Sequence, residues 1–276
     1  MNDHMKTHRE LLTRELLCIA DTYWVLGHWY IKCMLNGRSI ADFNSLAGFA
    51  QDTLGNTRAI FSFLEETYDM PEHQLEFGRD AWAIQSMGTL DAAPESWGDF
   101  VMTAYLVECA VWKATKTMQS DAIPEIKMLL RRLGESLYYR EIYIEGWIDA
   151  FSREERDDAA RVASRRLSET FAWFEGGVPD PLVDAGIRTG SLADARTAWL
   201  EKIRPVMASA TGKALDESRL PESTPDGWDR AARRPGRPVP AGLWEFMMPS
   251  SDEALLARRP LAVSITDNLD LFSESA

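Results

Sequence analysis

Pairs of histidine and carboxylate at helical spacing are the first chemistry to look for in this chain, because side chains three residues apart share one helix face and can hold a metal together. The chain has four histidines: His4, His8, His28 and His73. The residues three positions before them are apolar: Met1, Met5, Val25 and Met70. No Glu-x-x-His pair therefore exists in the sequence. A conventional di-iron centre needs two such pairs and two further Glu, so it cannot be built here.

The stretch QDTLGNTR, residues 51–58, has the frame of such a pair without its ligands. It lies inside a helical run, and Thr53 and Asn56 stand at the two positions, three residues apart, that a Glu and a His would fill. Both side chains are neutral and can form hydrogen bonds. The stretch indicates either an unusual metal site or a site whose ligands have been replaced.

Other catalytic arrangements fit the sequence poorly. It contains no Gly-x-Ser-x-Gly motif and no glycine-rich phosphate loop, and Gly176-Gly177 is typical of a helix end. Cys18, Cys33 and Cys109 lie in apolar helical contexts without a Cys-x-x-Cys pair. They indicate small buried side chains in a reducing compartment.

Charge and hydropathy exclude two classes of partner. The net charge is −13 and the isoelectric point is near 4.8, so the average surface would repel a nucleic-acid backbone. No run approaches the roughly 18 apolar residues of a membrane span, and the start, MNDHMKTHRE, lacks the apolar core of a signal peptide. We expect a cytoplasmic protein that binds neither nucleic acid nor membrane.

Helical periodicity extends from residue 8 to about residue 210. It predicts long helices over 8–35, 40–67, 98–118 and 123–150, two further helices over 152–175 and 181–210, and a weaker helix over 72–87. Long helices with short links predict an all-α antiparallel bundle with accessory helices over residues 1–211. Trp24 and Trp29 fall on different faces of the first helix, so we expect it to have neighbours on more than one side. The helix faces that carry Trp24 or Trp29 are candidate docking surfaces, as is the C-terminal extension described next.

Residues 212–276 form a C-terminal extension of different composition. Pro- and Arg-containing stretches alternate there with the apolar islands GLWEFMMP and PLAVSITDNLDLF, which are too short to build a core of their own. The extension is either a partly disordered tail or an arm packed on its own domain or on a partner. We favour the arm, because leaving Trp244 and Phe246 exposed would be costly.

Four segments together resemble the ferritin-like subunits of the bacterial phenylacetyl-CoA epoxidase, a multicomponent monooxygenase. They are ADTYWVLGHWY, QDTLGNTR, AYLVECAVW and ESLYYREIYIEGW, and the resemblance covers about residues 15–175. That enzyme pairs a catalytic di-iron subunit with a related structural subunit that has lost the metal. The first segment looks more like the structural subunit. The resemblance therefore implies a ferritin-like fold and a non-catalytic role.

The resemblance also implies which residues stand at the ligand positions. In catalytic members the second helix reads Asp-Glu-x-Gly-His, and here the same frame places Thr53 and Asn56 at the Glu and the His. The first helix has Lys32 at its ligand position, whereas the third keeps its carboxylate as Glu108.

The fourth helix is aligned least securely with the family. Its Glu-x-x-His frame falls on Ser136 and Tyr139, and Glu135 lies one residue away from the ligand face. Five of the six ligand positions are therefore substituted. Removing these groups removes charges whose burial and mutual repulsion only metal cations could offset.

Glu108 would remain as a buried anion and would need a counter-ion. Lys32 on a facing helix is our candidate, in an ion pair that occupies the vacated centre. The alternative is that Lys32 extends to the surface near its helix end while Glu108 pairs elsewhere. Asp21 and His28 share a helix face with Lys32, and His28 is expected to be a hydrogen-bonded core or interface histidine. Asp52 is expected to form a salt bridge.

Three function classes stay open. We favour a structural partner subunit without a cofactor or catalytic residues of its own, bound to a related catalytic di-iron subunit that acts on an aromatic acyl-CoA or a similar substrate; a homodimer is the alternative assembly. The second class is an oxygenase whose metal is held by Glu108, Glu135, Asp52 and His28. The third is a homo-oligomeric binding protein with an apolar pocket at the bundle centre.

Overall fold

The computed structural model describes residues 3–174, 180–221 and 225–248. The α-helices are α1 Asp3–Thr7, α2 Arg9–Cys33, α3 Ile40–Tyr68, α4 Glu72–Phe77, α5 Trp97–Thr117, α6 Pro124–Glu135, α7 Leu137–Asp149, α8 Arg153–Ala172, α9 Pro181–Asp184, α10 Leu192–Thr211 and α11 Ala241–Met247. Short 3₁₀ helices cover Met34–Asn36, Gly88–Leu90 and Glu217–Arg219. Two short strands, β1 Trp228–Asp229 and β2 Arg234–Pro235, pair antiparallel.

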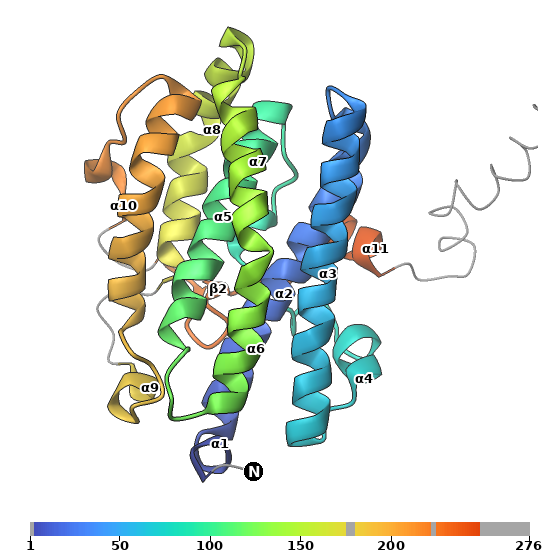
Figure 1. Ribbon diagram of the computed structural model, residues 1–276, viewed down its shortest axis with the longest axis vertical. Helices are drawn as coiled ribbons and strands as arrows, with labels where there is room; N and C mark the ends of the chain where they lie inside the picture. The colour runs from blue at the N-terminus through green and yellow to red at the C-terminus, as the bar shows by residue number, and fades with distance from the viewer. Residues whose placement is uncertain (1–2, 175–179, 222–224, 249–276) are drawn as a thin grey trace, which may run out of the picture.

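The long helices pack as a ferritin-like bundle, which confirms the predicted fold class (Figure 1). Helix α3 packs along α2, while α5 packs against α7, α8 and α10. All residues of α5 from 98 to 111 are buried, because this helix has neighbours on every side. Trp24 and Trp29 are both buried in α2. The expectation that this helix has neighbours on more than one side is confirmed, since α2 contacts both α3 and α5. The expectation that the two tryptophans form docking surfaces is wrong, because both side chains are buried within the chain itself.

Several predicted helix boundaries change in the structure. The helix predicted over 123–150 is two consecutive helices, α6 and α7, joined at Ser136. The helix predicted over 181–210 is also divided, because Ser191 begins α10 with a capping box that includes Asp194. The helix predicted over 72–87 ends at Phe77. The expected helix end at Gly176-Gly177 lies outside the described residues.

Part of the C-terminal extension packs on its own bundle. Val239 donates its backbone N–H to the Ala81 carbonyl at 3.0 Å. The Arg234 guanidinium is buried and makes two 3.0 Å hydrogen bonds to the Asp91 carboxylate. Residues 225–248 thus form a packed arm, as we favoured. The second apolar island, residues 260–272, lies outside the described residues.

Replacing Arg234 by methionine is expected to lower the free energy of unfolding by about 3 kcal/mol, because Asp91 would keep a buried charge without its main partner. Arg237 is the matched control, since its Nε lies 3.6 Å from the same Asp91 carboxylate but its side chain is 60% exposed. Arg237→Met should change stability by less than about 1 kcal/mol. Chemical denaturation measures both values, and equal losses would contradict the assigned role of the buried guanidinium.

None of the helices in the described part of the chain is long and apolar enough to span a membrane.

Candidate functional site

A buried ion pair lies between α5 and α7. Glu108 stands at the middle of α5, and its side chain is 0% exposed. Arg140 of α7 is likewise 0% exposed and makes two hydrogen bonds to it, Nε to Oε1 at 2.7 Å and Nη2 to Oε2 at 3.1 Å. This two-point geometry is the strongest form of carboxylate recognition by arginine.

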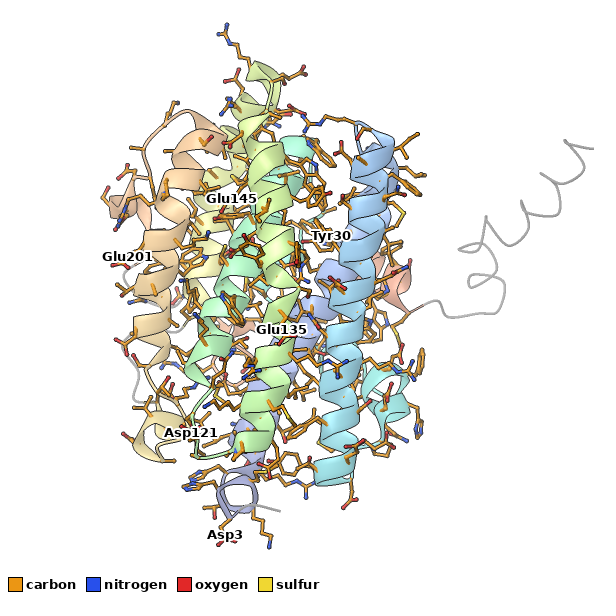
Figure 2. All side chains as sticks on the ribbon, in the orientation of Figure 1. Asp3, Tyr30, Asp121, Glu135, Glu145 and Glu201 are labelled. Atoms are coloured by element: carbon orange, nitrogen blue, oxygen red, sulfur yellow. The ribbon has the colours of Figure 1, made fainter. Side chains whose placement is uncertain are left out.

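Further polar groups complete the shell of this pair. The Tyr30 hydroxyl donates to Glu108 Oε1 at 3.0 Å, and Figure 2 labels Tyr30 between the α6–α7 column and α3. Arg140 Nη1 donates to Ser136 Oγ at 2.8 Å and lies 3.5 Å from Asp52 Oδ2. The guanidinium thus bridges three helices, since Asp52 belongs to α3. The predicted salt bridge of Asp52 is confirmed, with a partner that we had not predicted.

The surroundings of Arg140 and Tyr30 shift the pKa values of both side chains. Burial by itself lowers the pKa of Arg140, but the Glu108 carboxylate outweighs burial and raises that pKa, so the guanidinium stays charged. Burial, followed by the Glu108 charge, raises the pKa of Tyr30 well above its ordinary value. Tyr30 therefore stays protonated and acts as a hydrogen-bond donor. The Arg140 guanidinium thus supplies a lasting positive charge beside the Glu108 carboxylate.

The predicted ion pair between Lys32 and Glu108 is wrong. Lys32 is exposed in the last turn of α2, and its Nζ lies 5.3 Å from the ring centroid of Phe246 on α11. An ammonium on a flexible stem stays hydrated at low cost near a helix end, which was our alternative for Lys32. The carboxylate of Glu108 pairs with Arg140 instead.

Two residues of the fourth helix that were expected at or near the old site lie outside the bundle centre. Tyr139 is 67% exposed and Glu135 is exposed, so neither faces the bundle centre. The residue that faces the centre is Arg140, one position beyond the aligned frame. An arginine one helical turn after Ser136, within an otherwise apolar face, is the signal that could have found it.

Thr53 and Asn56 of the QDTLGNTR frame differ in how deeply they are buried. Thr53 is buried, and its hydroxyl donates to the Phe49 carbonyl one turn earlier at 2.8 Å. Helix α2 passes close by, since a Cβ on Gly27 would lie 2.9 Å from Thr53 Oγ1. Asn56 is partly buried, and its Nδ2 has no hydrogen-bond partner among the described residues. The frame therefore packs two helices together at Thr53.

Asp21 belongs to a different cluster from Glu108. It is fully buried, and both of its oxygens accept hydrogen bonds from Arg79, at 2.6 and 2.8 Å. His28 lies with its Nδ1 2.8 Å from the Trp24 carbonyl and its ring edge-on to Phe246. The prediction that His28 is a hydrogen-bonded histidine is confirmed, and its ring packs against the arm of the same chain.

The donor set at the bundle centre does not fit a di-iron centre. It offers the single buried carboxylate Glu108, already bound by a guanidinium, where two metal ions need several carboxylates and imidazoles. Across the described ranges, no three His, Cys, Asp or Glu side chains gather in a way that could hold a metal ion. The atypical site of Glu108, Glu135, Asp52 and His28 is therefore not assembled in this structure.

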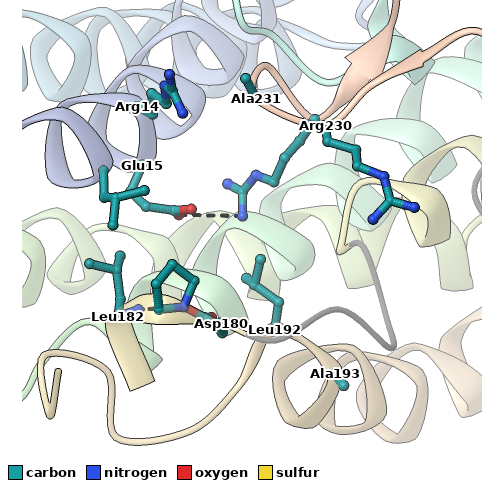
Figure 3. Close-up of a pocket in the computed structure, with 11 residues that line it drawn as sticks. Arg14, Glu15, Asp180, Leu182, Leu192, Ala193, Arg230 and Ala231 are labelled. Atoms are coloured by element: carbon teal, nitrogen blue, oxygen red, sulfur yellow. Dashed lines mark hydrogen bonds and ion pairs between the residues drawn. The ribbon is translucent and has the colours of Figure 1, made fainter. Parts of the chain in front are cut away.

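The pocket shown in Figure 3 does not match the expected apolar cavity. It lies between α2, α9 and the arm, and charged residues from these elements line it, among them Glu15, Asp180 and Arg230. Glu15 forms an ion pair across it with Arg233 at 3.3 Å. Apolar side chains such as Leu182 and Leu192 form the rest of its lining, so the pocket is mixed in character. It is also not at the bundle centre, which aromatic side chains and the Glu108–Arg140 pair occupy.

A comparison with protein families supplies the identification. The sequence model described as phenylacetic acid catabolic protein matches residues 1–231. The chain belongs to this family. The predicted resemblance is thereby confirmed at the level of the family, which includes subunits of a multicomponent oxygenase. A search of curated proteins finds no match to this chain.

Proposed function

We propose that this chain is the non-catalytic structural subunit of a di-iron oxygenase and binds a related subunit that carries the metal. The observation that supports this most is the bidentate ion pair between Arg140 and Glu108 at the bundle centre. Two features of the sequence also support the proposal. The QDTLGNTR frame carries the neutral residues Thr53 and Asn56, and no Glu-x-x-His pair occurs in the sequence.

The physical argument concerns charge balance in the core. A carboxylate such as Glu108 is tolerated inside a bundle only with a compensating cation and with hydrogen bonds to its lone pairs. In a metal-bearing bundle, iron supplies that positive charge. Here Arg140 supplies it, with Tyr30 and Ser136 satisfying the remaining donors and acceptors. The bundle can then keep its packing without metal, as a structural subunit requires.

The family's role in phenylacetic acid catabolism supports an aromatic acyl-CoA or similar acid derivative as the substrate of the complex. The complex would work in the cytoplasm. Substrate oxidation would take place in the metal-bearing subunit, and this chain would stabilise it.

Iron binding tests the proposal directly. The purified chain, incubated anaerobically with Fe(II) and desalted, is expected to hold iron far below stoichiometry by plasma emission spectrometry. A metal-bearing member of the family with intact Glu-x-x-His pairs, treated identically, is the control and should retain about two iron ions per chain. Stoichiometric iron in this chain, abolished in a Glu108→Ala variant, would instead support the oxygenase with an atypical site.

A further inference from the structure

A cavity of about 540 Å³ lies between α2, α3, α4 and α11. Figure 1 shows α4 and α11 on the side of α3 away from the α6–α7 column. The volume falls within the range of about 300–1,000 Å³ that is usual for small-molecule sites. Met247 of α11 forms part of the lining, so the cavity is complete only when the C-terminal arm is packed on the bundle.

The apolar part of the lining is largely aromatic. Trp24 of α2 and Phe61 of α3 are 4% and 2% exposed, and their rings meet edge to face with centroids 6.1 Å apart. Leu54 and Met247 lie beside them in the lining. Aromatic and aliphatic surfaces of this kind take up the apolar body of a ligand.

The QDTLGNTR stretch contributes an open side of the cavity. Gly55 lies in the lining and is exposed, and an added Cβ there would meet no atom within 4 Å. Glycine weakens a helix relative to other residues, and nothing that packs against Gly55 requires it to be small. Its missing side chain leaves space through which a small molecule can reach Trp24 and Phe61.

The charged groups of the lining leave one negative charge without a partner. These groups are Arg58, Glu72 and Glu76, with His28 counted as neutral. Arg58 Nε lies 3.0 Å from Glu72 Oε1, so these two charges balance each other. Glu76 follows Glu72 by one turn of α4, and within the described ranges it has no ion-pair or hydrogen-bond partner.

The surroundings of Glu76 favour a positively charged ligand. Burial, followed by the charge of Glu72, raises the pKa of Glu76 above its ordinary value, so the ionised form lacks stabilisation. Arg79 lies against the ring of Phe61, at 5.3 Å from its centroid, but both oxygens of Asp21 already bind its guanidinium. The chain as a whole carries a net charge of −13, which also attracts cations.

We propose that this cavity binds a small organic amine. Its apolar body would lie against Trp24 and Phe61, and its ammonium group would donate to the Glu76 carboxylate. The bound cation would balance the one lining charge that has no partner. This inference does not depend on the proposed role of the chain beside a metal-bearing subunit, because none of these residues belongs to the Glu108–Arg140 site.

Benzylamine and benzoate are matched probes, because both carry one small aromatic ring and they have opposite charges near neutral pH. Titration of the full chain, followed by saturation-transfer NMR of the probe ring protons, is expected to show saturable binding of benzylamine and none of benzoate over the same concentrations. Benzoate that binds as tightly as benzylamine overturns the assigned ligand class. An absence of saturable benzylamine binding overturns the site itself.

Glu76→Gln tests the role of the carboxylate. It keeps the size of the side chain and removes the charge, so benzylamine binding should weaken by about tenfold, as expected when a charged hydrogen bond is lost. Glu66→Gln is the matched control, because Glu66 is an exposed carboxylate on α3 that is not part of the lining. Equal weakening in the two variants would reveal a general charge effect and would overturn the role of Glu76.

Gly55→Leu tests where the amine binds. The leucine side chain enters open space, so the thermal unfolding temperature should stay the same or rise, whereas saturable benzylamine binding should be lost. Gly48→Leu is the matched control, because this glycine of α3 also has open space around it but does not line the cavity. If both variants bind benzylamine like the wild-type chain, the amine does not occupy this cavity and the inference is overturned.

Discussion

Replacing Arg140 by methionine is expected to lower the free energy of unfolding by about 3–5 kcal/mol, the largest loss we expect from a single substitution in this protein. Methionine keeps much of the side-chain volume but leaves Glu108 as a buried charge whose remaining hydrogen bond comes from Tyr30. For a chain of this size the loss corresponds to a fall in unfolding temperature of about 6–20 °C. Calorimetry and urea denaturation measure it.

Two variants separate the ion pair from general effects on packing. The double variant Arg140→Met/Glu108→Leu removes both charges, and it should recover much of the stability lost in the single variant because no buried charge is left unpaired. Arg131→Met, at an exposed position on α6, should change stability by less than about 0.5 kcal/mol. Equal losses in the single and double variants would contradict the role assigned to Arg140.

Replacing Arg166 by lysine is expected to lower the free energy of unfolding by about 3 kcal/mol, a loss as large as that of Arg234→Met and smaller only than that of Arg140→Met. The guanidinium makes hydrogen bonds of 2.9 and 2.8 Å to Asp99 and donates to the carbonyls of Thr89, Ala92 and Ala93. Five contacts in a plane suit a guanidinium, whereas an ammonium cannot span them. The loop before α5 should therefore lose its anchor. Hydrogen exchange of residues 86–95 measures this, with Arg165→Lys on the exposed side as control.

The same pair gives stability a defined pH dependence. Burial by itself would raise the pKa of Asp99, but the hydrogen bonds and charge of Arg166 outweigh burial and hold the pKa below its ordinary value. A lowered pKa in the folded state contributes stability above the unfolded pKa of about 3.9, and that stability is lost as the pH falls through the folded value. The acid unfolding midpoint should move to higher pH in Asp99→Asn. An unchanged midpoint would show that Asp99 does not contribute.

The helices were predictable because their signals are local. Ser39, Ser96 and Ser152 cap the starts of α3, α5 and α8, and an apolar stripe follows each of them. The helix boundaries that were predicted wrongly also have local causes. The capped turn at Ser191, which separates α9 from α10, was hidden inside a continuous helical period, and the loop after Phe77 carries too few breakers to be recognised.

The sequence by itself determined that this protein is a helical bundle, that it has no Glu-x-x-His pair, and that it belongs to its family, because periodicity, residue spacing and family motifs are properties of the chain order. Only the tertiary structure decided which cation meets Glu108. Arg140 and Tyr139 are neighbours in sequence but point about 100° apart on the helix, so one fills the bundle centre and the other the outer face. Lys32 remains at the surface because a buried carboxylate is satisfied better by a two-point guanidinium than by a hydrated ammonium.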